Sequence, residues 1–146
     1  MRFNCTDSNI RENITFVTPS IMLKPVIFVA IGSAAGGVCR FLMQQYVQRR
    51  IFSSFPYGTL CVNILGCFII GIIYGLTARG NVLSDNGRIF LATGICGGFT
   101  TYSSFMGENY TMLQSGEVLH TFLYTALSLF IGFGATALGV ICVKLI

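Results

Sequence analysis

The sequence predicts an all-α membrane protein with four transmembrane helices, the third of which is broken at mid-membrane. Hydrophobic residues make up 53% of the 146 residues and charged residues only 10%, whereas a soluble domain carries about 25% charged residues. The apolar residues fall into four long runs separated by short polar connections. Among these runs, the third stands out because glycines and hydroxyl side chains interrupt it.

Each apolar run is long enough to cross a bilayer as a helix, which takes about 20 residues. The expected spans run from Pro25 to Val47, from Tyr57 to Ala78, from Ile89 to Leu113 and from Val118 to Val143. The connections contain the turn-forming residues Gly, Asn and Pro. The last connection, residues 114–117, is so short that the two helices it joins are expected to be antiparallel neighbours.

The domain organisation is simple. Residues 1–21 are polar and lack a helical apolar stripe, so we expect a tail, with Met22 as an alternative start of the chain. Residues 22–146 are expected to form one four-helix domain. The apolar stretch after Lys24 runs into Gly36 and Arg40 without a small-residue cleavage site, so the first span is predicted to stay in the chain. The expected location is the bacterial inner membrane, as a multi-pass protein.

The charge pattern gives only a weak orientation. With four spans, Lys24, Arg79, Arg88 and Lys144 fall on one side and Arg49 and Arg50 on the other. So small a bias predicts a chain that inserts both ways up and forms an antiparallel homodimer; a single, modestly biased topology is the alternative. Glycines four apart in three of the spans predict close helix packing, which leaves more room for a polar path between protomers than within one.

The segment from Gly94 to Glu108 is the predicted working part of the molecule. Irregular, hydroxyl-rich backbone at membrane depth is tolerated only where it is buried in protein or lines a watery cavity. Tyr102 and Phe105 are three residues apart, and Ser104 and Glu108 are four apart, so rings stack on one helix face and a hydroxyl lies above a carboxylate on another. Ring edges can solvate an anion, although core packing is the common use of such a pair.

Three other polar features need an explanation inside the membrane. Arg40 either snorkels to the interface or projects inward as a positive potential that attracts anions. Asn63 lies too deep to snorkel, so it requires a partner across the bundle or a permeating species. Tyr124 and Ser128 align on the fourth helix, although such hydroxyls often bond their own helix.

The composition argues against an enzyme. His120 is the only histidine, and no Ser/His/Asp set, acid pair or metal-ligand cluster can be assembled. The six cysteines include no C-x-x-C pair, so they are interpreted as small apolar packing residues. The expected partners are membrane lipid and a second copy of the chain, with no indication of a nucleic-acid partner.

Four segments together resemble the fluoride channel family known as Fluc or CrcB, over essentially all of residues 22–146. They are the Gly-Gly-Val-Cys-Arg run that ends at Arg40, the segment from Pro56 to Gly66, the Gly-Gly-Phe-Thr-Thr-Tyr-Ser-Ser-Phe core of the third span, and the Tyr124/Ser128 pair. The resemblance implies an antiparallel homodimer with two fluoride pores at the protomer interface. It also implies that the channel passively exports fluoride and so lowers its cytoplasmic concentration.

The resemblance also assigns roles to individual residues. It implies a structural sodium ion, Na+, held by the backbone carbonyls of Gly97 and Thr100 where the third helix breaks at Gly97-Gly98. The residues expected to line the pore are Asn63, Tyr102, Ser104, Phe105, Tyr124 and Ser128, with Arg40 and Glu108 in supporting roles. Tyr102 departs from the family, which usually has phenylalanine there, so the first ring brings an extra hydroxyl.

The main alternative is a proton-coupled exporter of small cationic molecules, which can also be a four-helix, dual-topology dimer. Such a transporter needs a membrane-embedded carboxylate, usually early in the chain and beside aromatic residues. The first span offers Arg40 and no acid, the chain has no tryptophan, and Glu108 is the only carboxylate clearly inside a span. A purely structural membrane protein is the remaining alternative.

Overall fold

The computed structural model describes residues 19–51, 53–80 and 82–146, and every regular element in these ranges is helical. Most of the expected tail, residues 1–18, lies outside the described residues. Three helices are long and apolar enough to cross a membrane: α2 (Pro19–Arg50), α3 (Tyr57–Ala78) and α7 (Val118–Leu145). An all-α membrane protein is therefore confirmed. Among the described residues the first helix, α2, begins at Pro19, inside the stretch that we expected to belong to the tail.

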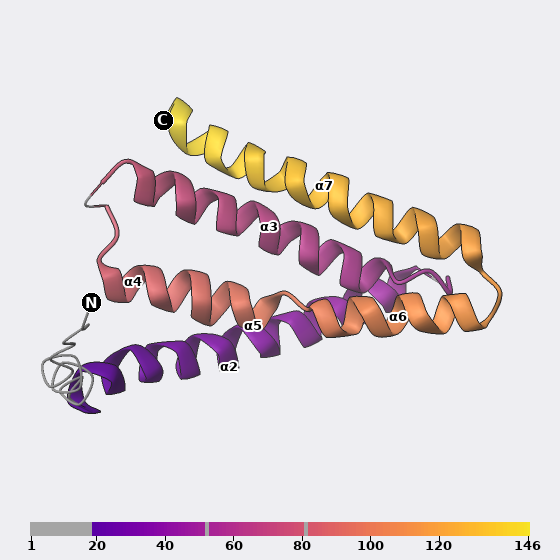
Figure 1. Cartoon of the computed structure of the whole chain (residues 1–146), viewed down its shortest axis with the longest axis horizontal. Helices are drawn as coiled ribbons and strands as arrows, with labels where there is room; N and C mark the ends of the chain where they lie inside the picture. The colour runs from indigo at the N-terminus through magenta and orange to yellow at the C-terminus, as the bar shows by residue number, and fades with distance from the viewer. Residues whose placement is uncertain (1–18, 52, 81) are drawn as a thin grey trace, which may run out of the picture.

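The third predicted span is a broken helix (Figure 1). Its first part runs through α4 (Asp85–Arg88), the π-helix η1 (Ile89–Cys96) and α5 (Gly97–Phe99). Its second part is α6 (Tyr102–Gln114), and two extended residues, Thr100 and Thr101, separate the parts. Its pieces are too short to count as a single long apolar helix, so this segment is not among the three spans above.

The position of the break corrects our prediction. We expected Gly97-Gly98 to interrupt the helix, but both residues are helical and the break follows at Thr100 and Thr101. Gly98 serves close packing instead: a Cβ at this position would lie 2.5 Å from the carbonyl oxygen of Ser33 on α2. Extended backbone suits the β-branched threonines, whose side chains lose less rotamer freedom in a strand conformation than in a helix.

The helices pack in two close pairs (Figure 1). α3 runs along α7, and α2 runs along η1 and α5. In the second pair, a Cβ at Gly32 of α2 would lie 2.8 Å from the Cα of Gly94 in η1, so the two backbones touch. Such contact through small residues is the packing that membrane helices use where lipid removes the usual hydrophobic drive.

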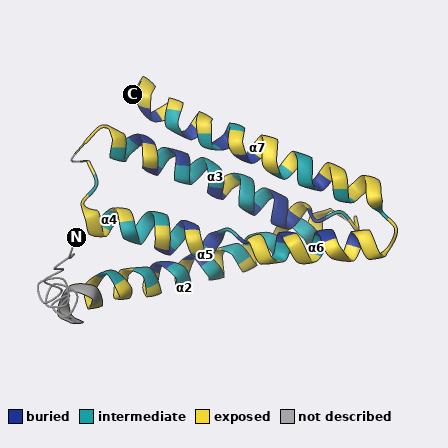
Figure 2. Ribbon diagram, viewed as in Figure 1, coloured by how far each residue is buried: buried dark blue, intermediate teal, exposed yellow. Residues whose placement is uncertain are grey.

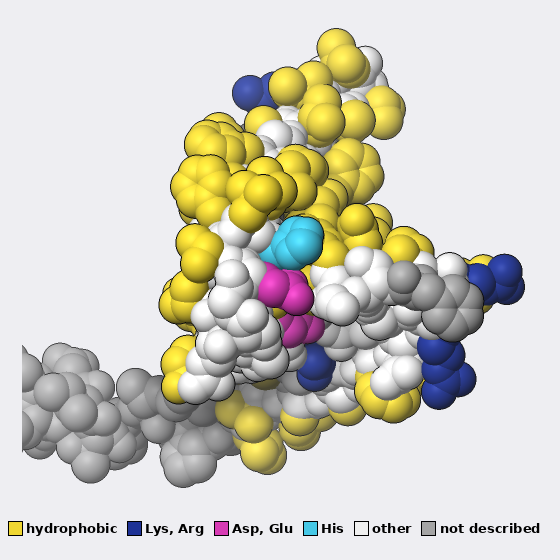
Figure 3. Space-filling model, turned by 90° about the vertical axis from the view of Figure 1, so that its right-hand side faces the viewer, with side chains coloured by type: hydrophobic (Ala, Val, Ile, Leu, Met, Phe, Trp, Pro, Cys, Tyr) yellow, Lys and Arg dark blue, Asp and Glu magenta, His cyan; other side chains and the backbone are white. Residues whose placement is uncertain are grey.

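Few side chains are buried, and most of the burial lies between the helices (Figure 2). The buried cluster of Leu60, Phe105, Met112 and Tyr124 joins α3, α6 and α7. The outside is largely apolar: Phe130 and Phe133 on α7 are 79% and 81% exposed. Figure 3 shows hydrophobic side chains over much of one face, with charged groups gathered in a few places. This pattern suits a molecule surrounded by lipid or by a second copy.

Candidate functional site

The centre of the site is a two-point clamp between Asn63 on α3 and the break. The Thr101 amide donates to Oδ1 of Asn63 at 2.9 Å, and Nδ2 of Asn63 donates to the Thr101 carbonyl at 3.1 Å. Thr101 also caps α6, because its Oγ1 accepts from the Ser104 amide at 3.2 Å. Both backbone groups of Thr101 are thus bonded to a side chain rather than left unpaired in the membrane.

A groove of about 410 Å³ opens beside this clamp, between α3, the broken helix and α7. Asn63 and Thr101 both lie on its wall. Its lining contains six of the residues singled out from the sequence, namely Asn63, Gly97, Thr100, Tyr102, Phe105 and Ser128. The described lining residues include no acid and no base, so the groove is uncharged and its polar character comes from amide, hydroxyl and carbonyl groups.

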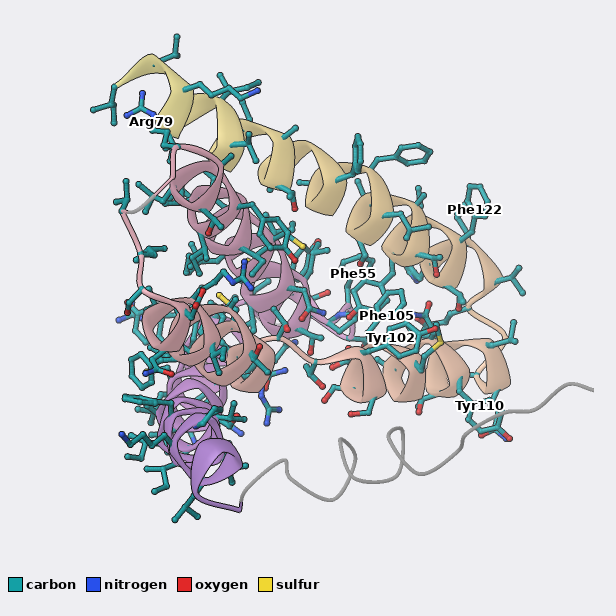
Figure 4. All side chains as sticks on the ribbon, turned by 60° about the vertical axis from the view of Figure 1, so that its left-hand side comes forward. Phe55, Arg79, Tyr102, Phe105, Tyr110 and Phe122 are labelled. Carbon is teal, nitrogen blue, oxygen red and sulfur yellow. The ribbon has the colours of Figure 1, made fainter. Side chains whose placement is uncertain are left out.

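The two rings predicted to face an ion lie next to each other. Their centroids are 6.0 Å apart with a tilt of 39°, and they lie together near Phe55 in Figure 4. Tyr102 is 72% exposed, whereas Phe105 is only 7% exposed and packs against Tyr124 at 5.0 Å. Tyr102 is therefore the outer ring and Phe105 the inner, fixed ring.

Ser128 carries a hydroxyl with no internal partner. Its Oγ is buried and makes no hydrogen bond to any part of the chain that the structure describes, and the residue lines the groove. A buried polar atom of this kind is uncommon in proteins and calls for an explanation such as a bound water or ion. It is thus an O–H donor available to an occupant of the groove.

A second cavity of about 380 Å³ is bordered by α6 and the α2–α3 connection. Ser104 and Glu108, predicted to stack on one helix face, both line it, together with Ser54, Pro56, Gly107, Thr111 and Met112. The structure thus places six of the predicted residues on the groove and two on the second cavity, whereas Arg40 and Tyr124 line neither.

Glu108 is held by donors from two other helices. Thr59 Oγ1 on α3 donates to one carboxylate oxygen at 2.5 Å, and the Tyr124 hydroxyl on α7 donates to the other at 2.7 Å. Tyr124 has no exposed surface. Tyr124 is not among the lining residues of either cavity in the single chain, where it packs against Phe105 and bonds Glu108; its place in the pore lining stays a prediction.

Two backbone carbonyls at the break are released from helical bonding. In a continuous helix the amides of Thr101 and Ser104 would bond the carbonyls of Gly97 and Thr100, four residues earlier. Both amides bond side chains instead, on Asn63 and Thr101 respectively. Carbonyl oxygens are hard ligands of the kind that bind alkali and alkaline-earth cations. The described residues hold no cluster of three or more His, Cys, Asp or Glu side chains.

Arg40 bonds to the broken helix and is not among the lining residues of the groove. Its Nε donates to the Gly98 carbonyl at 3.2 Å, at the C-terminal end of the first part of the broken helix. A cation there complements the negative end of the helix dipole. Arg40 therefore braces α2 against the break.

Three polar residues of the site, namely Gln44, Thr59 and Asn109, were not singled out from the sequence. Gln44 donates to Thr59 at 2.9 Å, which extends the Glu108 network to α2. Asn109 donates to the Phe105 carbonyl at 2.8 Å and accepts from Thr125 at 3.0 Å. Their signal was present, since each is a polar side chain within a predicted apolar span.

Comparison with known proteins identifies the family of this chain. The family model described as CrcB-like protein, Camphor Resistance (CrcB), matches residues 27–140. A protein of Flavobacterium psychrophilum named fluoride-specific ion channel FluC is 40% identical over 122 residues, which is 84% of this chain and 98% of the relative. Proteins of the same name are 44% identical in Azobacteroides pseudotrichonymphae and 43% identical in Chlorobium chlorochromatii, each over 82% of this chain and over 96% and 92% of the relative. The match spans every site residue described above, and the chain belongs to the CrcB family.

Proposed function

We propose that this chain forms a fluoride-specific ion channel of the bacterial cell membrane that passively exports fluoride and lowers its cytoplasmic concentration. The observation that carries the proposal is a groove whose described lining is uncharged and whose wall holds the Ser128 hydroxyl, which has no partner among the described residues. Fluoride is small and strongly hydrated, so a path that conducts it must replace its water with several closely placed donors. Relatives of this chain that carry the name fluoride-specific ion channel support the same function.

The donors in the groove come from three kinds of group. Ser128 supplies its O–H, and Asn63 retains one of its two Nδ2 hydrogens after bonding the Thr101 carbonyl. Tyr102 and Phe105 supply ring edges, which carry partial positive charge. Larger halides are held less tightly by water but fit a narrow lining poorly, which favours selection by size.

The proposed path continues from the groove past Phe105 to the second cavity. Ser104 on that cavity offers the next hydroxyl. Glu108 lies beside it, but both of its oxygens accept internal donors, which lessens the repulsion that a free carboxylate would exert on an anion. The same occupancy disfavours a proton-coupled cation exporter, because that mechanism needs a carboxylate open to its substrate.

We further propose that the broken helix counts as a fourth span and that two copies assemble as an antiparallel, dual-topology homodimer. The connections support this count, since α2–α3 and α6–α7 lie at one end of the molecule and α3–α4 at the other (Figure 1). The exposed outer ring of Tyr102, at the open side of the groove, supports closure by a second copy. Each pore would then have walls from both protomers.

A structural sodium ion at the break is the third part of the proposal. The carbonyls of Gly97 and Thr100 would hold it, since both line the groove and neither receives its usual helical amide. The ion would supply a fixed positive charge that stabilises the non-helical backbone. Two side chains also hold the break in place, since Asn63 bonds Thr101 on one side of it and Arg40 bonds Gly98 on the other.

Ion efflux from liposomes tests the proposed function. Purified protein is reconstituted into vesicles loaded with potassium fluoride or potassium chloride, and efflux is started with valinomycin in the absence of a pH gradient. A channel releases fluoride at once and retains chloride. Fluoride release that requires an imposed proton gradient would favour the transporter.

A further inference from the structure

Gln44 is the outermost member of the hydrogen-bond chain that ends at Glu108. Its Nε2 donates to Thr59 Oγ1 at 2.9 Å across the α2–α3 contact. The backbones are close here, since a Cβ at Gly58 would lie 2.7 Å from the carbonyl oxygen of Gln44. Thr59 itself is only 3% exposed, so solvent does not compete for its hydroxyl.

The hydrogen-bond chain has a fixed direction from donor to acceptor, because the Thr59 hydroxyl carries only one proton. Thr59 accepts from Gln44, which commits its own proton to Glu108. The other carboxylate oxygen is occupied by Tyr124 from α7. The carboxylate is therefore gripped from α3 and α7, and the amide on α2 decides which way the α3 hydroxyl points.

We propose that Gln44 is a positioning residue for ion conduction: it turns the Thr59 hydroxyl toward Glu108 and so holds the carboxylate against the wall of the second cavity. Without the amide donor, the Thr59 hydroxyl is free to bond the carbonyl of Phe55, four residues earlier and just before α3, in the pattern that threonines often adopt. Glu108 then loses one of its two donors and can swing toward Ser104 on the same cavity. A carboxylate there repels an anion. This part of the inference rests on the proposed fluoride path.

Reversing the direction of the hydrogen bonds between residues 44, 59 and 108 provides the test. In Gln44→Glu, two carboxylates face a hydroxyl that has one proton to give. In Glu108→Gln, one amide oxygen must serve two hydroxyl donors: either the N–H group faces the Thr59 proton, or the amide flips and the Tyr124 hydroxyl loses its acceptor. In the double variant both mismatches disappear, because Thr59 donates to residue 44, accepts from the amide of residue 108, and Tyr124 donates to the remaining amide oxygen.

Gln45 provides a matched control. It is the neighbouring glutamine on α2 and is exposed, so Gln45→Glu makes the same charge change at a residue that takes no part in the hydrogen-bond chain. The double variant Gln45→Glu with Glu108→Gln has the same net charge as the reversed pair but cannot reverse the hydrogen bonds.

Two measurements are made on the purified full chain: the thermal midpoint in detergent and fluoride efflux from liposomes. We expect each single variant at positions 44 and 108 to lower the midpoint, and the reversed pair to recover about 5 °C relative to the sum of the single effects. We expect efflux through the reversed pair to exceed efflux through either single variant. Gln45→Glu should match the wild type, and its double variant should match Glu108→Gln.

Additive midpoints in the reversed pair would overturn the assigned direction of the chain. Recovery of the midpoint with efflux no higher than in the single variants would overturn the positioning role. A failure of the proposed function looks different, because the wild type itself would then release no fluoride while the midpoints could still show the coupling.

Discussion

Asn63 bonds both backbone groups of Thr101, accepting from its amide at 2.9 Å and donating to its carbonyl at 3.1 Å. One side chain on α3 thus takes the place of the helical hydrogen bonds that the break removes. The sequence predicted that Asn63 needs a partner across the bundle or a permeating species, and the structure supplies the first while leaving one N–H hydrogen for the second.

Loss of this clamp should damage both stability and conduction. We expect Asn63→Ala to lower the free energy of unfolding by about 1–3 kcal/mol for each backbone group left unpaired, and to abolish fluoride efflux. Thermal unfolding and liposome efflux measure the two effects. Thr77→Ala is the control, since the Thr77 hydroxyl bonds only the Ile73 carbonyl within α3; equal losses in both variants would refute the clamp.

Tyr102 tests whether the ring or its hydroxyl matters. The side chain is 72% exposed, and the solvating edge belongs to the ring. We expect Tyr102→Phe to keep fluoride efflux and chloride exclusion, with stability changed by less than about 0.5 kcal/mol. Tyr102→Leu, which removes the ring, should reduce efflux strongly. Loss of efflux in the phenylalanine variant would show that the hydroxyl takes part in conduction.

Asn109 should contribute to stability by fixing Phe105 between α6 and α7. Asn109→Leu leaves the Phe105 carbonyl and the Thr125 hydroxyl without this partner, which should cost about 1–3 kcal/mol. Adding Thr125→Val should recover part of that loss, because removing both partners of a buried bond costs less than removing one. Thermal unfolding of the two single variants and the double variant tests the coupling, and strictly additive losses would contradict it.

The contact between α2 and the broken helix should tolerate no added side chain at Gly36. A Cβ there would collide with the carbonyl oxygen of Ile95, whereas a Cβ at the adjacent Gly37 meets nothing within 4 Å. We expect Gly36→Ala to destabilise the fold by about 1–3 kcal/mol through overpacking, and Gly37→Ala to be neutral or slightly stabilising. Thermal midpoints decide, and the reverse order would contradict the described packing.

The proposed sodium ion should make stability depend on the cation. An ion that binds only the folded state raises the midpoint as its concentration rises. We therefore expect a higher thermal midpoint in sodium chloride than in potassium or choline chloride of equal ionic strength. Identical midpoints in all three salts would refute a sodium site at the Gly97 and Thr100 carbonyls.

Much of the fold could be predicted from hydropathy alone. The second span was expected at Tyr57–Ala78, which are the bounds of α3, and α7 extends two residues beyond the expected end at Val143. The length of an apolar run predicts such a helix, because a segment in lipid must form all of its backbone hydrogen bonds within itself. The π-helix Ile89–Cys96 and the position of the break could not be predicted, since both depend on how closely Gly94 and Gly98 approach α2.

The site was predictable in composition but not in its bonding. The hydroxyls, rings and amide of the groove stand out because polar groups are rare inside membranes. That Tyr124 turns to Glu108, and that Asn109 reaches Thr125, follows from the relative rotation of α3, α6 and α7. Sequence spacing along one helix contains no information about that rotation.

The most direct test of the central claim is halide efflux from liposomes containing the wild-type chain, with no pH gradient. The account predicts rapid release of fluoride and retention of chloride, because the groove offers a small anion a close set of O–H, N–H and ring-edge donors. Equal release of fluoride and chloride, or release of neither, would contradict it.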